Sequence, residues 1–156
     1  MQTMNGLDVL IMEHPFLSGI NPELCDLLGD CASRRLFASH QEIFHDGNEA
    51  SHFYLILTGS VALETFVPGC GMVTIQTLGP GDALGWSWLF PPYKWHFTAS
   101  TRAPTEVISF DAATLRAIAD ENRDFREELL TRVAKTLLRR LLGTRMQLID
   151  LYGMRP

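Results

Sequence analysis

The sequence predicts a mainly β fold with flanking helices: an antiparallel β jelly roll (double-stranded β-helix) with short N-terminal helices and two C-terminal helices. Two observations lead to this prediction. Between residues 34 and 110, short runs rich in β-branched and aromatic residues alternate with glycine-containing turns, a pattern typical of antiparallel β architectures. On both sides of this region, apolar residues recur at helical spacing. A chain of 156 residues suffices for one core, so we expect a single domain over 1–156, divided into 1–33, 34–110 and 111–152.

The N-terminal segment predicts two short helices. The apolar run Leu7–Met12 forms the first, which Pro15 ends. Asn21 is a good N-cap and Pro22 suits the first helical position, so a second helix is expected over Glu23–Leu28.

The central region predicts seven strands. Gly47 and Gly59 stand at hairpin corners, where the backbone needs a positive φ. The expected strands are 35–39, 42–45, 53–58, 61–67, 72–78, 94–101 and 105–110.

Two helices are expected after the strands. Asp111 is the N-cap of a helix over 112–121, and Asn122 or Asp124 begins a long helix that reaches about Leu151. The long helix carries two apolar stripes. The first, expected to pack on the sheet, consists of Phe125, Leu129, Val133 (or Leu130), Leu137, Leu141 and Leu148. The second, expected to form a homodimer with a second copy of the chain, consists of Leu130, Leu138, Leu142, Met146 and Ile149. The alternative, that both stripes pack on the parent sheet, stays open.

Charge is unevenly distributed along the chain. Residues 1–122 carry 5 basic and 14 acidic side chains, whereas residues 123–156 carry 8 basic and 4 acidic ones. A basic tail is compatible with nucleic-acid binding, but here its charges stand among leucines, without aromatic residues and without a helix-turn-helix pattern. We therefore expect a solvated helix face and no DNA binding by this chain alone.

The composition predicts a cytoplasmic protein. No apolar run approaches the ~20 residues of a membrane span, and the start lacks a basic segment typical of signal peptides. Cys25, Cys31 and Cys70 are odd in number and show no C-x-x-C spacing, so neither a disulfide framework nor a zinc site is indicated.

The sequence contains no motif typical of an enzyme, and we expect neither catalytic residues nor a cofactor. It has no nucleophile elbow and no phosphate-binding glycine loop. The jelly roll is also the fold of cupin metalloenzymes, but His40, His45, His52 and His96 contain no His-x-His pair, so no metal site is predicted. A cupin-like metal-dependent enzyme remains the second alternative.

Three glycine-containing motifs occur in order, at Ile43–Gly47, Phe53–Val61 and Leu78–Gly85. Together with the C-terminal helices, they resemble the cyclic nucleotide-binding domain of catabolite-activator-type regulators and protein kinase regulatory subunits. The resemblance extends from about His14 to Tyr152. It implies a non-enzymatic, ligand-sensing module of bacterial transcription-regulator type, here without a helix-turn-helix domain.

In that family, the segment after the last glycine turn binds the cyclic phosphate, using a glutamate for the ribose and an arginine for the phosphate. Carried over to this sequence, Gly85 matches the glycine of that segment and Trp86 stands at the glutamate position. The arginine position falls on Trp95, or on Lys94 if the register shifts by one. The resemblance therefore implies that cyclic nucleotide binding is weak, altered or lost.

All three tryptophans of the chain lie in residues 85–97, the tryptophan segment. One interpretation is that indoles plug the pocket, which would make the protein a protein–protein adaptor or regulatory subunit. Another is a remodelled pocket in which indoles stack on a flat small molecule, and a third is an exposed docking patch. Strand alternation predicts Trp95 and Phe97 on one face. The candidate ligand-binding residues are Gly85, Trp86, Ser87, Trp88, Lys94, Trp95 and His96.

Overall fold

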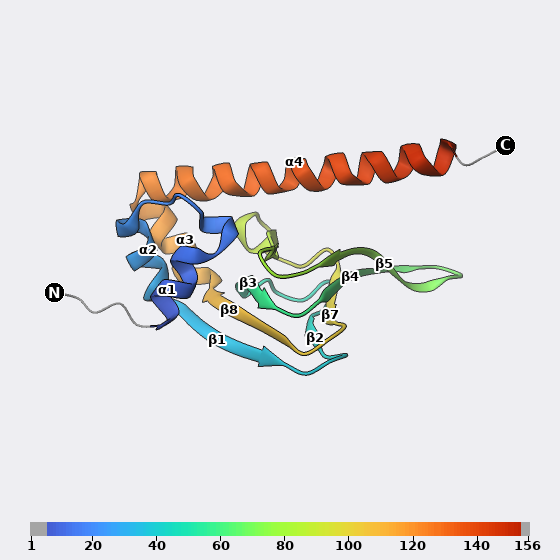
Figure 1. Ribbon diagram of the computed structural model, residues 1–156, viewed down its shortest axis with the longest axis horizontal. Coiled ribbons are helices and arrows are strands. Elements are labelled where there is room, and N and C mark those ends of the chain that lie inside the picture. Colours follow the sequence, from blue (N-terminus) through green and yellow to red (C-terminus); the bar gives the residue numbers. More distant parts are fainter. Residues whose placement is uncertain (1–5, 154–156) are drawn as a thin grey trace.

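Two four-stranded antiparallel sheets face each other in the computed structural model, which describes residues 6–153 (Figure 1). Their strand orders are β1-β8-β3-β6 and β2-β7-β4-β5. The strands are β1 (Ala32–Phe37), β2 (Glu42–Phe44), β3 (His52–Thr58), β4 (Val61–Val67), β5 (Gly71–Leu78), β6 (Ala83–Leu84), β7 (Thr98–Thr101) and β8 (Thr105–Asp111). The helices are α1 (Gly6–Glu13), η1 (Pro15–Leu17), α2 (Pro22–Gly29), η2 (Ser87–Leu89), α3 (Ala112–Glu121) and α4 (Arg123–Gly153). The predicted fold class, a mainly β antiparallel roll with flanking helices, is confirmed.

The strand prediction is wrong mainly at the strand before the last one. A strand was expected over 94–101, but β7 covers only Thr98–Thr101. Residues 93–95 pair instead with the turn at 47–50: the Trp95 N–H donates to the carbonyl of Asn48 (3.0 Å), and the Gly47 N–H donates to the carbonyl of Trp95 (2.9 Å). The chain then bends before it enters β7. The first expected strand, 35–39, is displaced to Ala32–Phe37, where it pairs with β8.

The glycines at the hairpin corners have the positive φ that the sequence predicts. Gly47 has φ +89° and Gly59 has φ +105°. At Gly59 a side chain would in addition collide with the backbone of Thr105. These two positions therefore fix where the strands turn.

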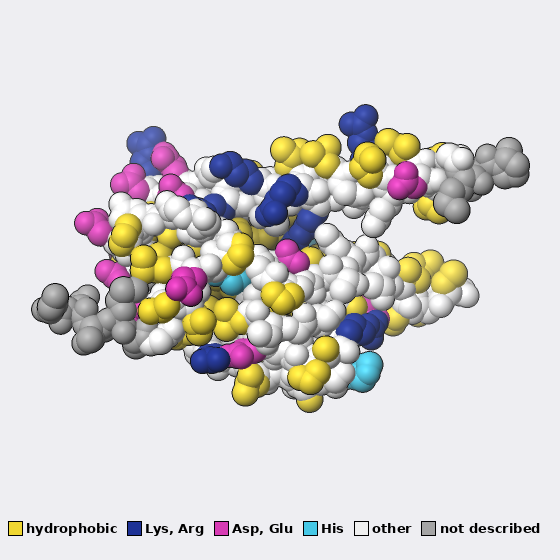
Figure 2. All heavy atoms as spheres, in the orientation of Figure 1, with side chains coloured by type: hydrophobic (Ala, Val, Ile, Leu, Met, Phe, Trp, Pro, Cys, Tyr) yellow, Lys and Arg dark blue, Asp and Glu magenta, His cyan; other side chains and the backbone are white. Residues whose placement is uncertain are grey.

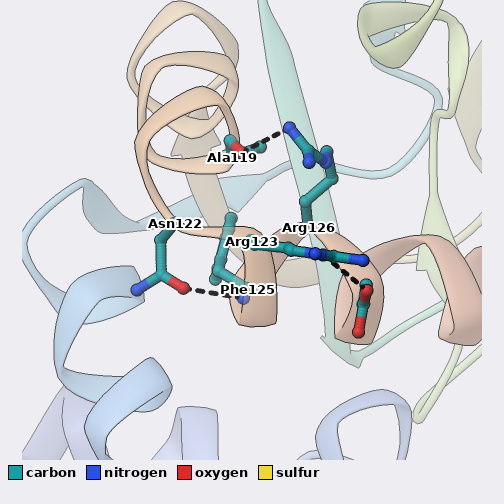
Figure 3. A network of polar contacts seen from close by, with 6 residues as sticks. Ala119, Asn122, Arg123, Phe125 and Arg126 are labelled. Atoms are coloured by element: carbon teal, nitrogen blue, oxygen red, sulfur yellow. Dashed lines mark hydrogen bonds and ion pairs between the residues drawn. The ribbon is translucent and has the colours of Figure 1, made fainter.

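The start of α4 is held by a polar network that Figure 3 shows. The Asn122 side chain accepts a hydrogen bond from the Phe125 N–H (3.0 Å), so Asn122 rather than Asp124 caps the helix. Arg126 donates back to the carbonyl of Ala119 in α3 (3.5 Å), and Arg123 pairs with Glu127 (3.1 Å). The direction in which α4 leaves α3 is thereby set.

The fully buried residues of α4 all lie in its first half. Its buried residues are Phe125, Leu129, Val133 and Thr136, and every described residue from 141 onward is exposed. In Figure 1 the helix runs on past the helical end of the molecule, in the same direction as the β4–β5 hairpin. The expectation that Leu137, Leu141 and Leu148 pack on the sheet is therefore wrong, because they are 43%, 66% and 52% exposed. Among the helices of residues 6–153, none is both long and apolar enough to cross a membrane.

His14 links the N-terminal helices to the roll as a neutral side chain. It is 3% exposed. Its Nδ1 accepts a hydrogen bond from the Phe16 N–H (3.2 Å), so the proton is on Nε2, which donates to the carbonyl of Ile56 (3.0 Å). Burial lowers the pKa of His14, an effect that the Ile56 carbonyl and the charge of Asp82 partly offset. Protonation would add a buried charge and remove the bond to Phe16.

The protein is therefore expected to lose stability in mild acid. The unfolded chain binds a proton at His14 near the ordinary pKa of about 6.5, whereas the folded chain binds it at lower pH. The free energy of unfolding should be at its plateau above about pH 7.5 and fall as the pH drops through 6.5. His52, whose pKa is also lowered by burial, acts in the same direction. Urea titrations at several pH values measure this slope.

A matched pair of variants tests whether His14 causes this dependence of the free energy of unfolding on pH. His14→Gln keeps a side-chain donor for Ile56 but cannot be protonated, so its stability should depend less on pH than that of the wild type. His96→Gln makes the same substitution at an exposed histidine and serves as the control. An unaltered slope in His14→Gln would contradict the prediction.

Candidate functional site

The tryptophan segment, residues 85–97, connects β6 to β7 and begins at a glycine that no other residue can replace. Gly85 has φ +93°, a left-handed conformation. The indole of Trp95 lies directly against it: a Cβ on Gly85 would be 2.5 Å from Cη2 of Trp95. The close approach of the ring to the backbone thus requires glycine for a second, independent reason.

All three indoles are removed from solvent. Trp86, Trp88 and Trp95 are 8%, 0% and 3% exposed. Trp95 stacks on Phe44 with a centroid distance of 3.8 Å and an interplanar angle of 10°. Trp86 and Trp88 both contact a different ring, Phe53, at centroid distances of 5.3 and 5.4 Å. The indoles therefore belong to two aromatic clusters in the core.

The structure does not bring all the predicted site residues together. Ser87 is buried at the start of η2, between Trp86 and Trp88 along the chain. Lys94 and His96 are exposed, on either side of the buried Trp95. Lys94 and His96 are therefore not enclosed in the core together with Trp95. Of the aromatic residues in the segment, Phe90 is the most exposed, at 52%.

Two of the buried indoles lack a polar partner. Nε1 of Trp86 and Nε1 of Trp88 make no hydrogen bond with any residue that the structure describes. A buried N–H without an acceptor carries a desolvation cost of about 1–3 kcal/mol. This indicates that packing of the rings, rather than polar bonding, holds these side chains in place.

Arg140 joins α4 to the start of the tryptophan segment. Its Nη2 donates to the carbonyl of Ala83 in β6 (2.5 Å), and its guanidinium carbon lies 5.8 Å from the ring centroid of Trp86. Burial lowers the pKa of Arg140; nearby Asp82 opposes this effect and neighbouring Arg139 adds to it. The sequence predicted a solvated basic face on this helix, and Arg140 departs from it because its side chain is partly buried and bonded to β6.

A polar cavity of about 250 Å³ opens between β5 and α4, beside Arg140. We call it the α4 cavity. Figure 2 shows basic side chains gathered along the middle of this helix. The lining residues are Ile75, Gln76, Thr77, Leu78, Asp82, Thr136, Arg139, Arg140, Gly143, Thr144 and Gln147.

Sequence reasoning missed the α4 cavity, although its charged residues carried a signal. Asp82 belongs to a motif that was used only to identify the fold. Arg139 and Arg140 are adjacent in the long helix. Together with the acidic turn residue, this pair of arginines could have indicated a charged site on this side of the roll. What could not be foreseen is that β5 and α4 lie next to each other.

The histidines do not converge on a metal-binding arrangement. In the part of the chain that the structure describes, no group of three or more histidine, cysteine, aspartate or glutamate side chains could hold a metal ion. His45 contacts Glu42 (2.6 Å) and His52 contacts Ser51 (2.9 Å), each within its own loop or strand. The cupin-like alternative gains no support from these positions.

Comparison with known proteins gives a consistent picture. Residues 34–122, more than half of the chain, match the family model described as a cyclic nucleotide-binding domain. The chain is 24% identical over 145 residues to a CRP-like cAMP-activated global transcriptional regulator of Mycobacterium tuberculosis, covering 93% of this chain but 63% of that protein. The chain thus spans less than two thirds of the length of this curated relative.

Solved structures agree on the fold. The catabolite activator protein of Thermus thermophilus is 26% identical, with a TM-score of 0.68, over 88% of this chain and 63% of that one. A cyclic nucleotide-binding domain from Methylobacillus flagellatus is 17% identical, with a TM-score of 0.81, over 92% of this chain and 83% of that one. The second likeness concerns the fold alone.

Proposed function

Because the chain belongs to the cyclic nucleotide-binding domain family, we propose that it is a non-enzymatic sensing module of a CRP-type regulator whose affinity for cyclic nucleotides is weak or lost. The observation that carries this proposal is the position of Trp95. Its ring fills the space between Gly85 and Phe44, so a ligand could enter there only by displacing a buried indole. Displacing a large buried aromatic side chain costs about 3–5 kcal/mol, which is close to the whole binding free energy of a ligand with a dissociation constant of about 1 mM.

Sensing requires that a ligand change the position or order of an element that a partner reads. We propose α4 for this role, because the bond from Arg140 to Ala83 ties it to the strand that leads into the tryptophan segment. A ligand that binds one arrangement of this contact better than another shifts the population of α4 positions by its differential affinity. The exposed half of α4 then carries the change outward.

A homodimer through α4 belongs to the same proposal. Apolar residues, with Thr144 as the one polar member, recur at spacings of three and four along an exposed face, the pattern of a two-stranded coiled coil. The face consists of Leu130, Ala134, Leu137, Leu141, Thr144, Leu148 and Leu151. It supports a dimer seam through Leu137 and Leu141. The seam predicted from the sequence runs through Leu130, Leu138, Leu142, Met146 and Ile149. It shares Leu130 with this face, has its other four residues on a neighbouring exposed face, and stays an alternative.

A protein–protein adaptor is the second candidate function. It is supported by exposed apolar side chains on the β4–β5 hairpin, where Phe66, Met72 and Ile75 are 65%, 48% and 52% exposed. An adaptor would use the same filled roll without sensing any small molecule.

Calorimetric titration with cyclic AMP and cyclic GMP tests the proposal. We expect dissociation constants in the high micromolar to millimolar range, because the segment offers no arginine fork for the phosphate and its interior is occupied. A submicromolar dissociation constant for either nucleotide would refute the proposal. A Trp95→Ala variant that folds and binds more tightly than the wild type would support the plug directly.

A further inference from the structure

The α4 cavity holds more positive charge than its lining residues balance. Arg139 and Arg140 both line it, and Asp82 is the acidic residue among the lining residues. Within residues 6–153, neither arginine forms an ion pair with a carboxylate. Arg140 is also partly buried, so water compensates its charge less than at an open surface. An anion in the cavity would supply the missing compensation.

Both arginines keep hydrogen-bond donors free for such an anion. One nitrogen of Arg140 is used on Ala83, and Arg139 makes a single long hydrogen bond to Thr136 (3.4 Å). A guanidinium has five N–H donors in a planar fork that suits phosphate oxygens. The volume of about 250 Å³ lies below the roughly 300–1,000 Å³ of pockets for drug-sized ligands, which favours a small metabolite.

We propose that the α4 cavity binds a small phosphomonoester, with Arg139 and Arg140 holding its phosphate group. A phosphomonoester carries a charge of about −1.5 to −2 at pH 7, close to that of two guanidinium groups, whereas a cyclic phosphodiester carries a single charge. This inference rests on the proposed sensing function, since it names the class of molecule sensed. Because Arg140 also holds Ala83, phosphate binding acts directly on the contact between α4 and β6.

Calorimetric titration of the full chain with ribose 5-phosphate tests this site, and ribose serves as the uncharged control. We expect ribose 5-phosphate to bind with a dissociation constant below about 1 mM and ribose not to bind. Arg139→Gln and Arg140→Gln should each weaken binding about tenfold or more, the usual effect of losing a charge-assisted hydrogen bond. Arg145→Gln removes the same charge from the same helix outside the cavity and should change the affinity less than about twofold.

Arg139→Gln keeps the test valid if Arg140→Gln fails to fold, because the Arg139 side chain is exposed and its hydrogen bond to Thr136 lies within α4. Absence of ribose 5-phosphate binding to the wild type would overturn the inference and leave the proposed function in place. An equal loss in Arg145→Gln would overturn it as well, because it would show diffuse attraction to a basic helix. Submicromolar cyclic AMP binding that Arg139→Gln does not alter would instead refute the proposed function.

Discussion

Replacing Trp95 with alanine is expected to lower the free energy of unfolding by about 3 to 5 kcal/mol, the cost of truncating a large aromatic side chain in a packed core. Trp95 is 3% exposed and loses two specific contacts in this variant, the stack on Phe44 and the contact with Gly85. The surrounding strands cannot close the space left by an indole without moving the β2–β7 pair. Urea unfolding followed by circular dichroism measures the change.

Phe90→Ala is the matched control for this variant. Phe90 belongs to the same segment but is 52% exposed, so its truncation should cost within about 1 kcal/mol. Trp95→Phe, which keeps an aromatic ring on Phe44, should lie between the two. A loss below about 1 kcal/mol in Trp95→Ala would mean that the indole lines an open, hydrated pocket, and the plug would have to be abandoned.

Replacing Leu141 with glutamate is expected to convert a dimer into a monomer of 17.5 kDa. Leu141 is 66% exposed in the single chain and lies at the centre of the three-and-four pattern on α4. In a dimer, two copies of the new carboxylate would face each other in an apolar seam, which is costly for each unpaired charge. Because Leu141 contacts no core in the single chain, the monomer should remain folded. Light scattering after gel filtration measures the mass, and circular dichroism checks the fold.

Leu142→Glu distinguishes the two possible seams on α4. If the seam runs through Leu137 and Leu141, a charge at Leu142 leaves the dimer intact. If the seam runs through Leu138 and Leu142, Leu142→Glu gives a monomer and Leu141→Glu leaves the dimer intact. A wild-type protein of monomeric mass at concentrations of about 100 µM would contradict both seams.

Much of the fold could be predicted because it depends on short-range signals. Glycines at 47 and 59 mark turns through their φ angles, and Asn21 and Asp111 cap helices through their own side chains: Asn21 accepts from the Glu23 N–H (2.9 Å) and Asp111 from the Thr114 N–H (2.9 Å). Such features need only neighbouring residues, so one sequence contains them completely.

The tryptophan segment and α4 were predicted less well because their conformations depend on distant residues. The strand expected at 94–101 is interrupted because Trp95 bonds to Asn48, which no local pattern reveals. Leucine spacing on α4 identifies apolar faces but not where the supporting roll ends. The burial of all three indoles and the arginines of the α4 cavity likewise depend on which elements meet in space. The assignment of Gly85, Trp86, Ser87, Trp88, Lys94, Trp95 and His96 to a ligand site stays a prediction.

Because α4 is buried against the rest of the protein only along its N-terminal part, its helical length is expected to depend on protein concentration. Its last roughly 13 residues, 141–153, about 20 Å of helix, are all exposed beyond the bond from Arg140 to Ala83. A helical stretch of that length is marginal in water when nothing packs on it. In a lone chain this part would fray from its C-terminal end, and association with a second copy would restore it. The distance over which α4 transmits a signal would therefore depend on protein concentration, being short when the protein is dilute and full when it is abundant.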